Sequence, residues 1–371
     1  MNNNIFKGGV LAIVSVALLF GIYFLSLANP VNLVTADLGR HIKNGEYLIQ
    51  TGEVIKTNFY SYTNPDFSVT NHHWGGGVLF YILWSLFGFK GVHLFFILLS
   101  LTTLFIFYKI ARKGAERNIV LLVGILVISL ISQRVEVRPE AFTYLFFGLF
   151  LFMFLQYRID KISFKKLLLF LLPIQVFWVN THIYFVLGPI IACAFLAEYI
   201  IRRNWKKTEE TLCAMVSFFI VSIINPFGLK GVLTPFTILS NYGYLIVENQ
   251  SVWFLAEVLP QLNLLIFVFI FILLTLSFII VFIKNRANLD LAMLFLFVFF
   301  SGMAWFMLRN FTLFGFFSLI IFSWNINIIT SKNHKTGNLE RSNNEKSKIF
   351  TPKRTGWFVL GILVIFFLFI F

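Results

Sequence analysis

The chain has 371 residues, of which 58% are hydrophobic and only 12% are charged, and its mean hydropathy is +0.84. Apolar runs long enough to cross a bilayer recur along it, which excludes an ordinary water-soluble enzyme or binding module. The formal net charge of +14 does not indicate a nucleic-acid partner. In a membrane protein the position of each charge matters more than the sum.

The apolar runs predict transmembrane α-helices. Backbone groups find no water in lipid, so only helices or a closed barrel can span it. Barrel strands would appear as short alternating segments, and the run over residues 262–283 does not alternate. We therefore expect an all-α polytopic membrane protein with a single transmembrane domain over residues 1–371. The eleven expected spans, with ends placed to within about 2–4 residues, are 6–28, 90–110, 118–133, 139–157, 165–179, 183–201, 209–224, 261–283, 289–308, 311–330 and 357–371.

The first apolar run, Phe6 to Ala28, is longer than the hydrophobic region of a usual signal peptide. We therefore interpret it as a span that the protein retains. The two cysteines, Cys193 and Cys213, lie inside expected spans and indicate no disulfide framework.

The distribution of basic residues predicts the orientation. With a cytoplasmic N-terminus, 22 of the 30 Lys and Arg residues fall on the cytoplasmic side, whereas the 16 acidic residues divide equally. A full span over Trp74–Phe87 would reverse every later loop, so we expect a juxtamembrane helix there. The polar segment 331–356 is expected to be a flexible cytoplasmic loop. The predicted location is the bacterial inner or plasma membrane.

In this topology the unusual polar residues gather at the outer face. They begin in the first outer loop, residues 29–89, and recur in later outer connections. None of the expected spans carries a charged residue or a histidine at its middle, whereas ion-coupled transporters usually do. The candidate residues on this face are Asp37, His41, His72, His73, Arg134, Glu136, Arg138, His182 and Arg309.

Asp37 opens a predicted helix from about residue 36 to 50, with Gly52 beyond it. An aspartate there can simply favour the positive end of the helix. His41 follows four residues later, on the same helix face. This spacing is compatible with a pair of ligands for a divalent metal such as Mg²⁺ or Mn²⁺, and equally with a hydrogen bond between the two side chains.

Arg134 and Arg138 flank Glu136 just before a helix expected to start near Pro139. They either extend to the membrane interface or face inward and bind an anionic phosphate, which arginine contacts in a bidentate manner. The pair His72-His73 is typical of an interfacial His/Trp belt. His182 lies in a short turn between two expected spans. Taken alone, it is an ordinary turn residue.

Taken in order, these residues form a recognisable series. It comprises D-x-x-x-H-x-x-x-G from Asp37, YSYT from Tyr60, N-H-x-W from Asn71, R-x-E-x-R-P-E from Arg134 and W-x-N-x-H from Trp178. The series, which covers most of residues 1–330, resembles the bacterial GT-C membrane glycosyltransferases. That group includes the protein O-mannosyltransferase-like and aminoarabinose-transferase-like proteins.

The resemblance implies a GT-C-like bundle with its active site at the extracytoplasmic face and a sugar donor carried on a polyprenyl phosphate. It implies that an acidic residue in the first outer loop is the catalytic position, as a base or a metal ligand, and Asp37 is the residue that fits it. The best-studied members carry an acidic pair where this chain has one aspartate, which leaves a metal requirement open. The expected reaction inverts the sugar carbon C1.

In this interpretation Arg134, Arg138 and Arg309 stabilise the lipid phosphate, and the remaining candidates contact the substrate. These are His72, His73, Glu136 and His182. The expected partners are the polyprenyl-phosphate sugar, membrane lipids and a glycan, lipid or protein acceptor. The alternatives are a non-enzymatic transporter or flippase of lipid-linked glycans, and an inactive GT-C-like partner subunit.

Overall fold

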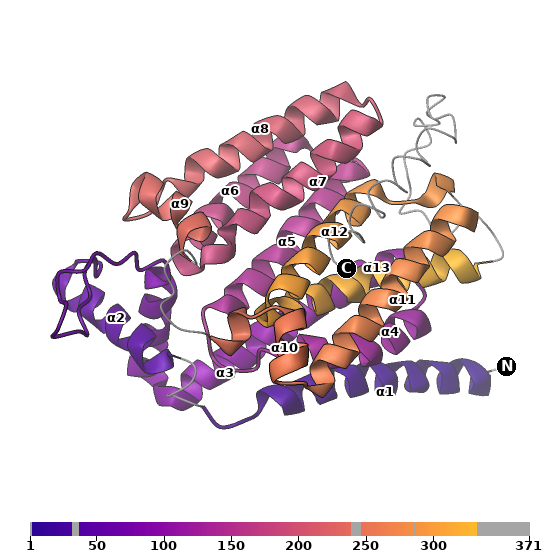
Figure 1. Cartoon of the computed structure of the whole chain (residues 1–371). Helices are drawn as coiled ribbons and strands as arrows, with labels where there is room; N and C mark the ends of the chain where they lie inside the picture. The colour runs from indigo at the N-terminus through magenta and orange to yellow at the C-terminus, as the bar shows by residue number, and fades with distance from the viewer. Residues whose placement is uncertain (1, 32–36, 239–245, 285, 332–371) are drawn as a thin grey trace.

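The structure is a computed structural model, and it describes residues 2–31, 37–238, 246–284 and 286–331 (Figure 1). Over these residues the regular elements are helices, and β pairing is limited to one isolated antiparallel bridge between Thr57 and Ser68. The expected all-α class is thus confirmed. Apolar runs become helices because a helix satisfies its own backbone hydrogen bonds.

The described helices follow the expected apolar runs closely, and their ends differ by a few residues. In chain order they are α1 (Asn2–Leu27), α2 (Leu38–Thr51), α3 (Trp74–Gly114), α4 (Arg117–Ile131), α5 (Glu140–Arg158), α6 (Phe164–Thr181), α7 (Leu187–Ile201), α8 (Trp205–Ser222), α9 (Gly228–Thr237), α10 (Val252–Val258), α11 (Leu262–Lys284), α12 (Leu291–Phe306) and α13 (Phe311–Thr330). Short 3₁₀ turns join some of them, among them η1 (Ile183–Val186), η2 (Val247–Asn249) and η4 (Leu308–Asn310).

Short connections make consecutive long helices run in opposite directions, which gives the bundle two ends (Figure 1). Glu140 and Arg158, the first and last residues of α5, lie at opposite ends, about 27 Å apart at 1.5 Å per residue. We call the end near Glu140, where α2 and residues 52–73 also lie, the loop end. The end near Arg158 is called the far end.

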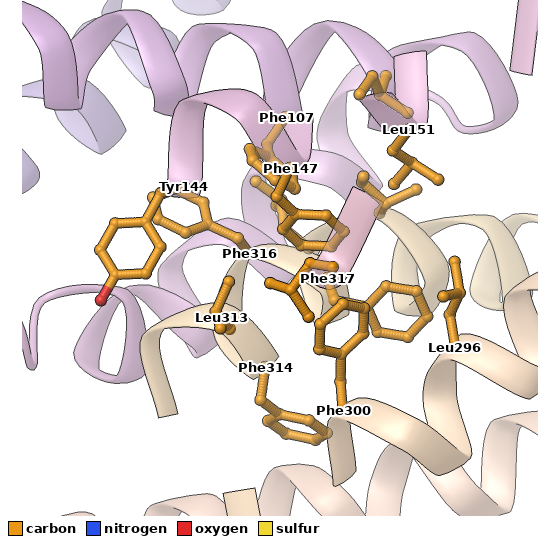
Figure 2. Close-up of a cluster of buried hydrophobic side chains, with 14 of the residues drawn as sticks. Phe107, Tyr144, Phe147, Leu151, Leu296, Phe300, Leu313, Phe314, Phe316 and Phe317 are labelled. Atoms are coloured by element: carbon orange, nitrogen blue, oxygen red, sulfur yellow. The ribbon is translucent and has the colours of Figure 1, made fainter. Parts of the chain in front are cut away.

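Aromatic packing around α13 forms the middle of the bundle (Figure 2). Phe316 of α13 stacks on Phe107 of α3 at 4.7 Å between ring centroids, and Phe147 of α5 meets Phe300 of α12 at 4.7 Å. These rings are buried. Lipid tails are as apolar as these side chains, so close van der Waals packing, rather than a hydrophobic driving force, holds the helices together.

Six described helical segments are long and apolar enough to cross a membrane. They are Trp74–Gly114, Glu140–Arg158, Phe164–Thr181, Ile183–Ile201, Leu262–Lys284 and Leu308–Thr330. Three shorter helices are also apolar: Val14–Leu27, Arg117–Ile131 and Leu291–Phe306. The chain is therefore consistent with a multi-pass membrane protein, whereas the expected total of eleven spans stays a prediction. The expected last span, 357–371, and the loop before it, from residue 332 onward, lie outside the described residues.

Helix α3 contains a break that separates the expected juxtamembrane helix from the span that follows it. Gly88 has φ 63° and ψ −166°, which are not helical values and which few residues other than glycine adopt. Five residues later, His93 Nε2 lies 2.9 Å from the carbonyl oxygen of Leu27, the last residue of α1. Residues 74–87 therefore extend past the end of α1, toward the loop end.

Candidate active site

Glycines allow the first outer loop to pack closely against the helix bundle. Helix α2 crosses the start of α3 at Gly45 and Gly77, where a side chain on Gly45 would overlap the Gly77 carbonyl. A Cβ atom on Gly77 would lie 2.7 Å from the carbonyl oxygen of His41, and one on Gly75 would lie 2.6 Å from that of Asn180. The glycine run after Trp74 thus lets α3 approach α2 and the end of α6 backbone to backbone.

Two motifs that are 100 residues apart in the sequence meet at this contact. Trp74 Nε1 donates a hydrogen bond to Asn180 Oδ1 at 2.8 Å, and His73 Nδ1 lies 3.3 Å from the Thr181 carbonyl oxygen. Behind them, Trp178 Nε1 donates to the hydroxyl of Thr143, which lies 2.8 Å from His182 Nδ1. The N-H-x-W and W-x-N-x-H motifs are therefore halves of one contact surface.

Four histidines form a continuous group around this contact. The ring centroids of His73 lie 5.2 Å from those of His41, 4.1 Å from His72 and 5.0 Å from His182. The fold thus brings together three of the predicted substrate-contacting residues and the histidine predicted beside Asp37.

Burial keeps these imidazoles uncharged near neutral pH. It lowers the pKa of His41 to about 3, that of His72 to about 4 and that of His182 to about 3, and it holds the pKa of His73 well below its ordinary value. Nearby arginines lower the pKa of His41 and His72 further, whereas the charge of Glu140 opposes the shift at His182. Neutral histidines can both donate and accept hydrogen bonds, which charged ones cannot.

Beside the histidines lies a group of alternating charges. Arg134 donates from Nε and Nη2 to Glu140 Oε2 at 3.0 and 2.8 Å, and from Nη1 to Glu248 Oε2 at 2.5 Å. Arg138 pairs with Glu136 at 2.7 Å and with the same Glu248 oxygen at 3.3 Å. Arg134 therefore faces inward, as one of the two sequence interpretations required, and Glu140 is only 3% exposed.

Arg309, contributed by η4, completes the group from the other side. Its Nη2 lies 3.9 Å from Glu140 Oε2, and its Nη1 donates to Asn249 Oδ1 at 3.2 Å. The guanidinium also lies over the ring of Tyr184, 5.7 Å from the centroid, and that ring contacts His182 at 5.0 Å. Tyr184 thus connects the arginines to the histidines, and the loop end carries one continuous polar site.

A small cleft lies against the charged group, with room inside it for about one water molecule before it opens to solvent. Arg134, Arg138 and Glu140 line it together with Phe96 of α3 and Ala141 of α5. The guanidinium groups there suit an anionic group, and apolar side chains lie beside them.

Asp37 lies at the N-terminus of α2, but it does not act as an ordinary helix cap. Its backbone is left-handed, with φ 55°, and its side chain makes no capping hydrogen bond. The carboxylate pairs with Arg40 at 3.1 Å and is 57% exposed. A left-handed aspartate is uncommon, and conformations of this kind gather at functional sites.

The sequence left open whether Asp37 and His41 form a hydrogen bond or a pair of metal ligands, and the structure answers the first of these questions. The two side chains do not share a hydrogen bond, because Asp37 faces Arg40 while His41 is buried with its Nδ1 unpartnered. Within the described residues no group of three or more His, Cys, Asp or Glu side chains is placed to hold a metal ion. Asp37 and His41 therefore do not form a metal site with other described side chains.

Several residues of the site were not singled out by the sequence. Glu140 entered there only as the last residue of the R-x-E-x-R-P-E motif, and Glu248 was not a candidate. Thr143 and Tyr184 lie inside expected spans and gave no signal. Whether a carboxylate lies buried beside an arginine depends on how the helices assemble, so a single sequence does not reveal it.

Comparison with known proteins adds no relative to this description. No family model matches the chain, and no curated protein sequence matches it significantly. The function is therefore argued from the site itself.

Proposed function

We propose that the chain is a membrane glycosyltransferase of the GT-C-like kind, which moves a sugar from a polyprenyl-phosphate donor to a glycan, lipid or protein acceptor. The reaction takes place at the loop end, which faces the outside of the cell in this proposal. The orientation rests on the excess of Lys and Arg in the connections of the far end.

One observation carries the proposal: Arg134, Arg138 and Glu140 line a small cleft beside Phe96 and Ala141. Arg309 of η4 joins this charged group through Glu140, and the histidines of the first loop and the end of α6 lie next to it through Tyr184. Arginine binds phosphate oxygens in a bidentate manner, and the apolar side chains suit the first isoprene units of a lipid. A lipid phosphate therefore matches both.

Carboxylates already pair these arginines, so a phosphate has to compete with them. Three arginines face Glu136, Glu140 and Glu248. Glu248 holds both Arg134 and Arg138, and it is more exposed than Glu140. Burial alone would raise the pKa of Glu248, but the hydrogen bond from Arg134 and the charges of Arg134, Arg309 and Arg138 together outweigh it and lower that pKa. Glu248 is therefore an ionised carboxylate in the place where a phosphate would bind.

In the proposed reaction Asp37 is the base. Its carboxylate takes the proton of an acceptor hydroxyl as that oxygen attacks the sugar carbon C1. The bond between C1 and the phosphate oxygen breaks, and the lipid phosphate leaves with the electron pair. Attack opposite the leaving group inverts C1. The guanidinium groups stabilise the charge that develops on the phosphate.

The test is transfer from polyprenyl-phosphate sugars to acceptors by purified protein in lipid, for the wild type and Asp37→Asn. Loss of a general base lowers rates by about 10²–10⁴-fold, and we expect a loss in this range with unchanged thermal stability. A matched control is Asp66→Asn, another exposed carboxylate of the first outer loop. Wild-type rates in Asp37→Asn would contradict the proposed base.

The same assay separates the alternatives. A flippase would move the lipid-linked sugar across liposomes without forming a glycoside, and it would not need Asp37. An inactive partner subunit would bind the lipid but transfer nothing. Addition of EDTA, followed by Mn²⁺ or Mg²⁺, tests whether a metal takes part.

A further inference from the structure

The hydrogen bonds of the histidine group define which nitrogen of each ring carries the proton. A backbone carbonyl oxygen can only accept a hydrogen bond, so a ring nitrogen beside it has to donate. His73 Nδ1 faces the carbonyl of Thr181 at 3.3 Å, and His72 Nδ1 faces that of Thr70 at 3.2 Å. Since burial keeps both rings neutral, the proton is on Nδ1 and the Nε2 atom presents a lone pair.

His182 has the opposite arrangement. Its Nδ1 accepts from the backbone N–H of Tyr184 at 3.3 Å, and a backbone N–H can only donate. The Thr143 hydroxyl, which lies 2.8 Å from the same nitrogen and accepts from Trp178, is then placed to donate its own proton to it. A neutral His182 therefore carries its proton on Nε2.

The two rings that differ in this way are neighbours. The centroids of His73 and His182 lie 5.0 Å apart, and the rings are inclined by only 30°. One presents an acceptor at Nε2 and the other a donor at Nε2. A hydroxyl group is the ligand that needs both, because it donates one hydrogen bond and accepts others.

The lone pairs also distinguish this half of the site from the arginine half. An anionic phosphate has only acceptor oxygens, so the lone pairs of His72 and His73 disfavour it, whereas the guanidinium groups favour it. The loop end is thus divided into a neutral half, which suits hydroxyl groups, and a cationic half, which suits an anion.

We propose that His73 and His182 form a donor–acceptor pair that binds a hydroxyl group of the donor sugar, while the arginines hold the lipid phosphate. The proposal rests on the proposed function and adds to it the orientation of the substrate. Thr143 is a positioning residue, since it holds the proton of His182 on Nε2 without touching the substrate.

The experiment compares two lipids of equal chain length, a polyprenyl phosphate and a polyprenyl-phosphate hexose, for binding to the protein in lipid nanodiscs. Replacing His73 by Phe removes the acceptor, replacing His182 by Phe removes the donor, and both variants keep an aromatic ring. Loss of such hydrogen bonds weakens binding by about tenfold. We expect this loss for the hexose lipid alone, with the phosphate lipid bound as before.

Two further variants keep the test independent of a folding defect. His182→Gln places an amide N–H near the position of Nε2–H, and we expect it to restore most of the affinity for the hexose lipid. His93→Gln alters a histidine that bonds only to the Leu27 carbonyl, and it is expected to change neither affinity. In the unliganded protein, ¹⁵N NMR is expected to find protonated Nδ1 in His73 and protonated Nε2 in His182.

The outcomes separate this proposal from the proposed function. A wild-type protein that binds neither lipid overturns both. If the wild type binds both lipids and the Phe variants lose equal affinity for the two, or none, the histidine pair is overturned while the lipid-phosphate site stands. Reversed tautomers in the NMR spectrum likewise overturn the pair alone.

Discussion

The two ends of the bundle carry buried charge groups of similar composition but different surroundings. At the far end Arg158 pairs with Glu198 at 3.3 Å and with Asp290 at 2.8 Å, and Arg202 pairs with Glu198 at 2.7 Å. Lys207 donates to the carbonyl oxygen of Arg158 at 2.7 Å. These contacts join the ends of α5, α7, α8 and α12, much as basic residues cap helix C-termini elsewhere.

At the loop end the charges lie beside an open cleft and a group of neutral histidines. Buried polar atoms there lack hydrogen-bond partners within the described structure, among them Glu140 Oε1, Arg309 Nε and His41 Nδ1. Leaving a buried polar atom unpaired costs about 1–3 kcal/mol. Unpartnered buried atoms occur at the far end too, among them Gln156 Nε2 and Arg117 Nε. What distinguishes the loop end is therefore the cleft and the group of neutral histidines beside its charges.

The largest expected effect is on stability, and it tests whether the charge group at the far end holds the fold together. Glu198→Gln removes a carboxylate that is only 2% exposed and leaves Arg158 and Arg202 without their shared partner. Breaking a buried pair in this way lowers the free energy of unfolding by about 3–5 kcal/mol. Thermal unfolding in detergent measures it, with the exposed Glu209→Gln as the control on the same end.

Lipid binding by the folded fraction of Glu198→Gln is expected to equal that of the wild type. A selective loss of lipid affinity, without a loss of stability, would show that the far end takes part in binding and would remove the contrast between the ends.

The next prediction concerns how the first loop is held on the bundle. In Gly77→Ala the new methyl group would lie 2.7 Å from the His41 carbonyl, so α2 has to move away from α3. Because a displacement of about 1 Å can cost about 10²-fold in rate, we expect sugar transfer to fall by that order. Gly39→Ala is the matched control, since nothing lies within 4 Å of its Cβ position in the same loop helix.

Helix α2 of Gly39→Ala should gain a few tenths of a kcal/mol, because alanine favours helix more than glycine does. Equal transfer rates in Gly77→Ala and the wild type would show that the close packing of α2 against α3 does not affect the site.

A smaller effect is expected from replacing Glu248, the carboxylate that pairs with both Arg134 and Arg138. Glu248→Gln removes the charge that holds Arg134 and Arg138, which leaves the cleft with one more net positive charge. We expect affinity for polyprenyl phosphate to rise about tenfold, equivalent to about 1.4 kcal/mol. Titration in nanodiscs at two salt concentrations measures it, and weaker binding in the variant would mean that Glu248 positions the arginines rather than competing with the lipid.

A further prediction concerns the dependence of loop stability on pH. Burial lowers the pKa of His41 and His182 to about 3, so the unfolded chain binds protons on these residues below pH 6.5 and the folded chain does not. Stability is therefore full above pH 6.5 and falls as the pH drops toward 4, by up to about 1.4 kcal/mol per pH unit and residue. The hydrogen-exchange protection factors of α2, which are corrected for the intrinsic pH dependence of amide exchange, are expected to fall over this range. Protection factors that are higher at pH 5 than at pH 7 would contradict neutral histidines.

The contrast also shows what a single sequence predicts. Helix α6 was expected over 165–179 and covers Phe164–Thr181, and the α2 helix ends at Gly52 as its left-handed φ of 76° requires. Apolar runs and glycine stops are local signals, so they predict helices well. The gathering of polar residues at one end was likewise predictable, because alternating spans place every second connection on the same side.

Contacts between particular helices were not predictable in this way. The role of the glycines after Trp74 depends on α2 and α6 both lying against that turn, and the pairing of Arg134 with Glu248 depends on how η2 folds back. Asp37 shows the same limit: its position in the loop followed from the motif, but its left-handed backbone and its pairing with Arg40 did not. Such features belong to tertiary packing, which no local pattern encodes.

The most direct measurement is a structure of the protein with bound polyprenyl phosphate. The account predicts that the phosphate lies within about 4 Å of the guanidinium groups of Arg134 and Arg138, displaces Glu248, and directs the first isoprene units along Phe96 and Ala141. A phosphate bound at the far end near Arg158 and Arg202, with the loop-end cleft empty, would contradict it.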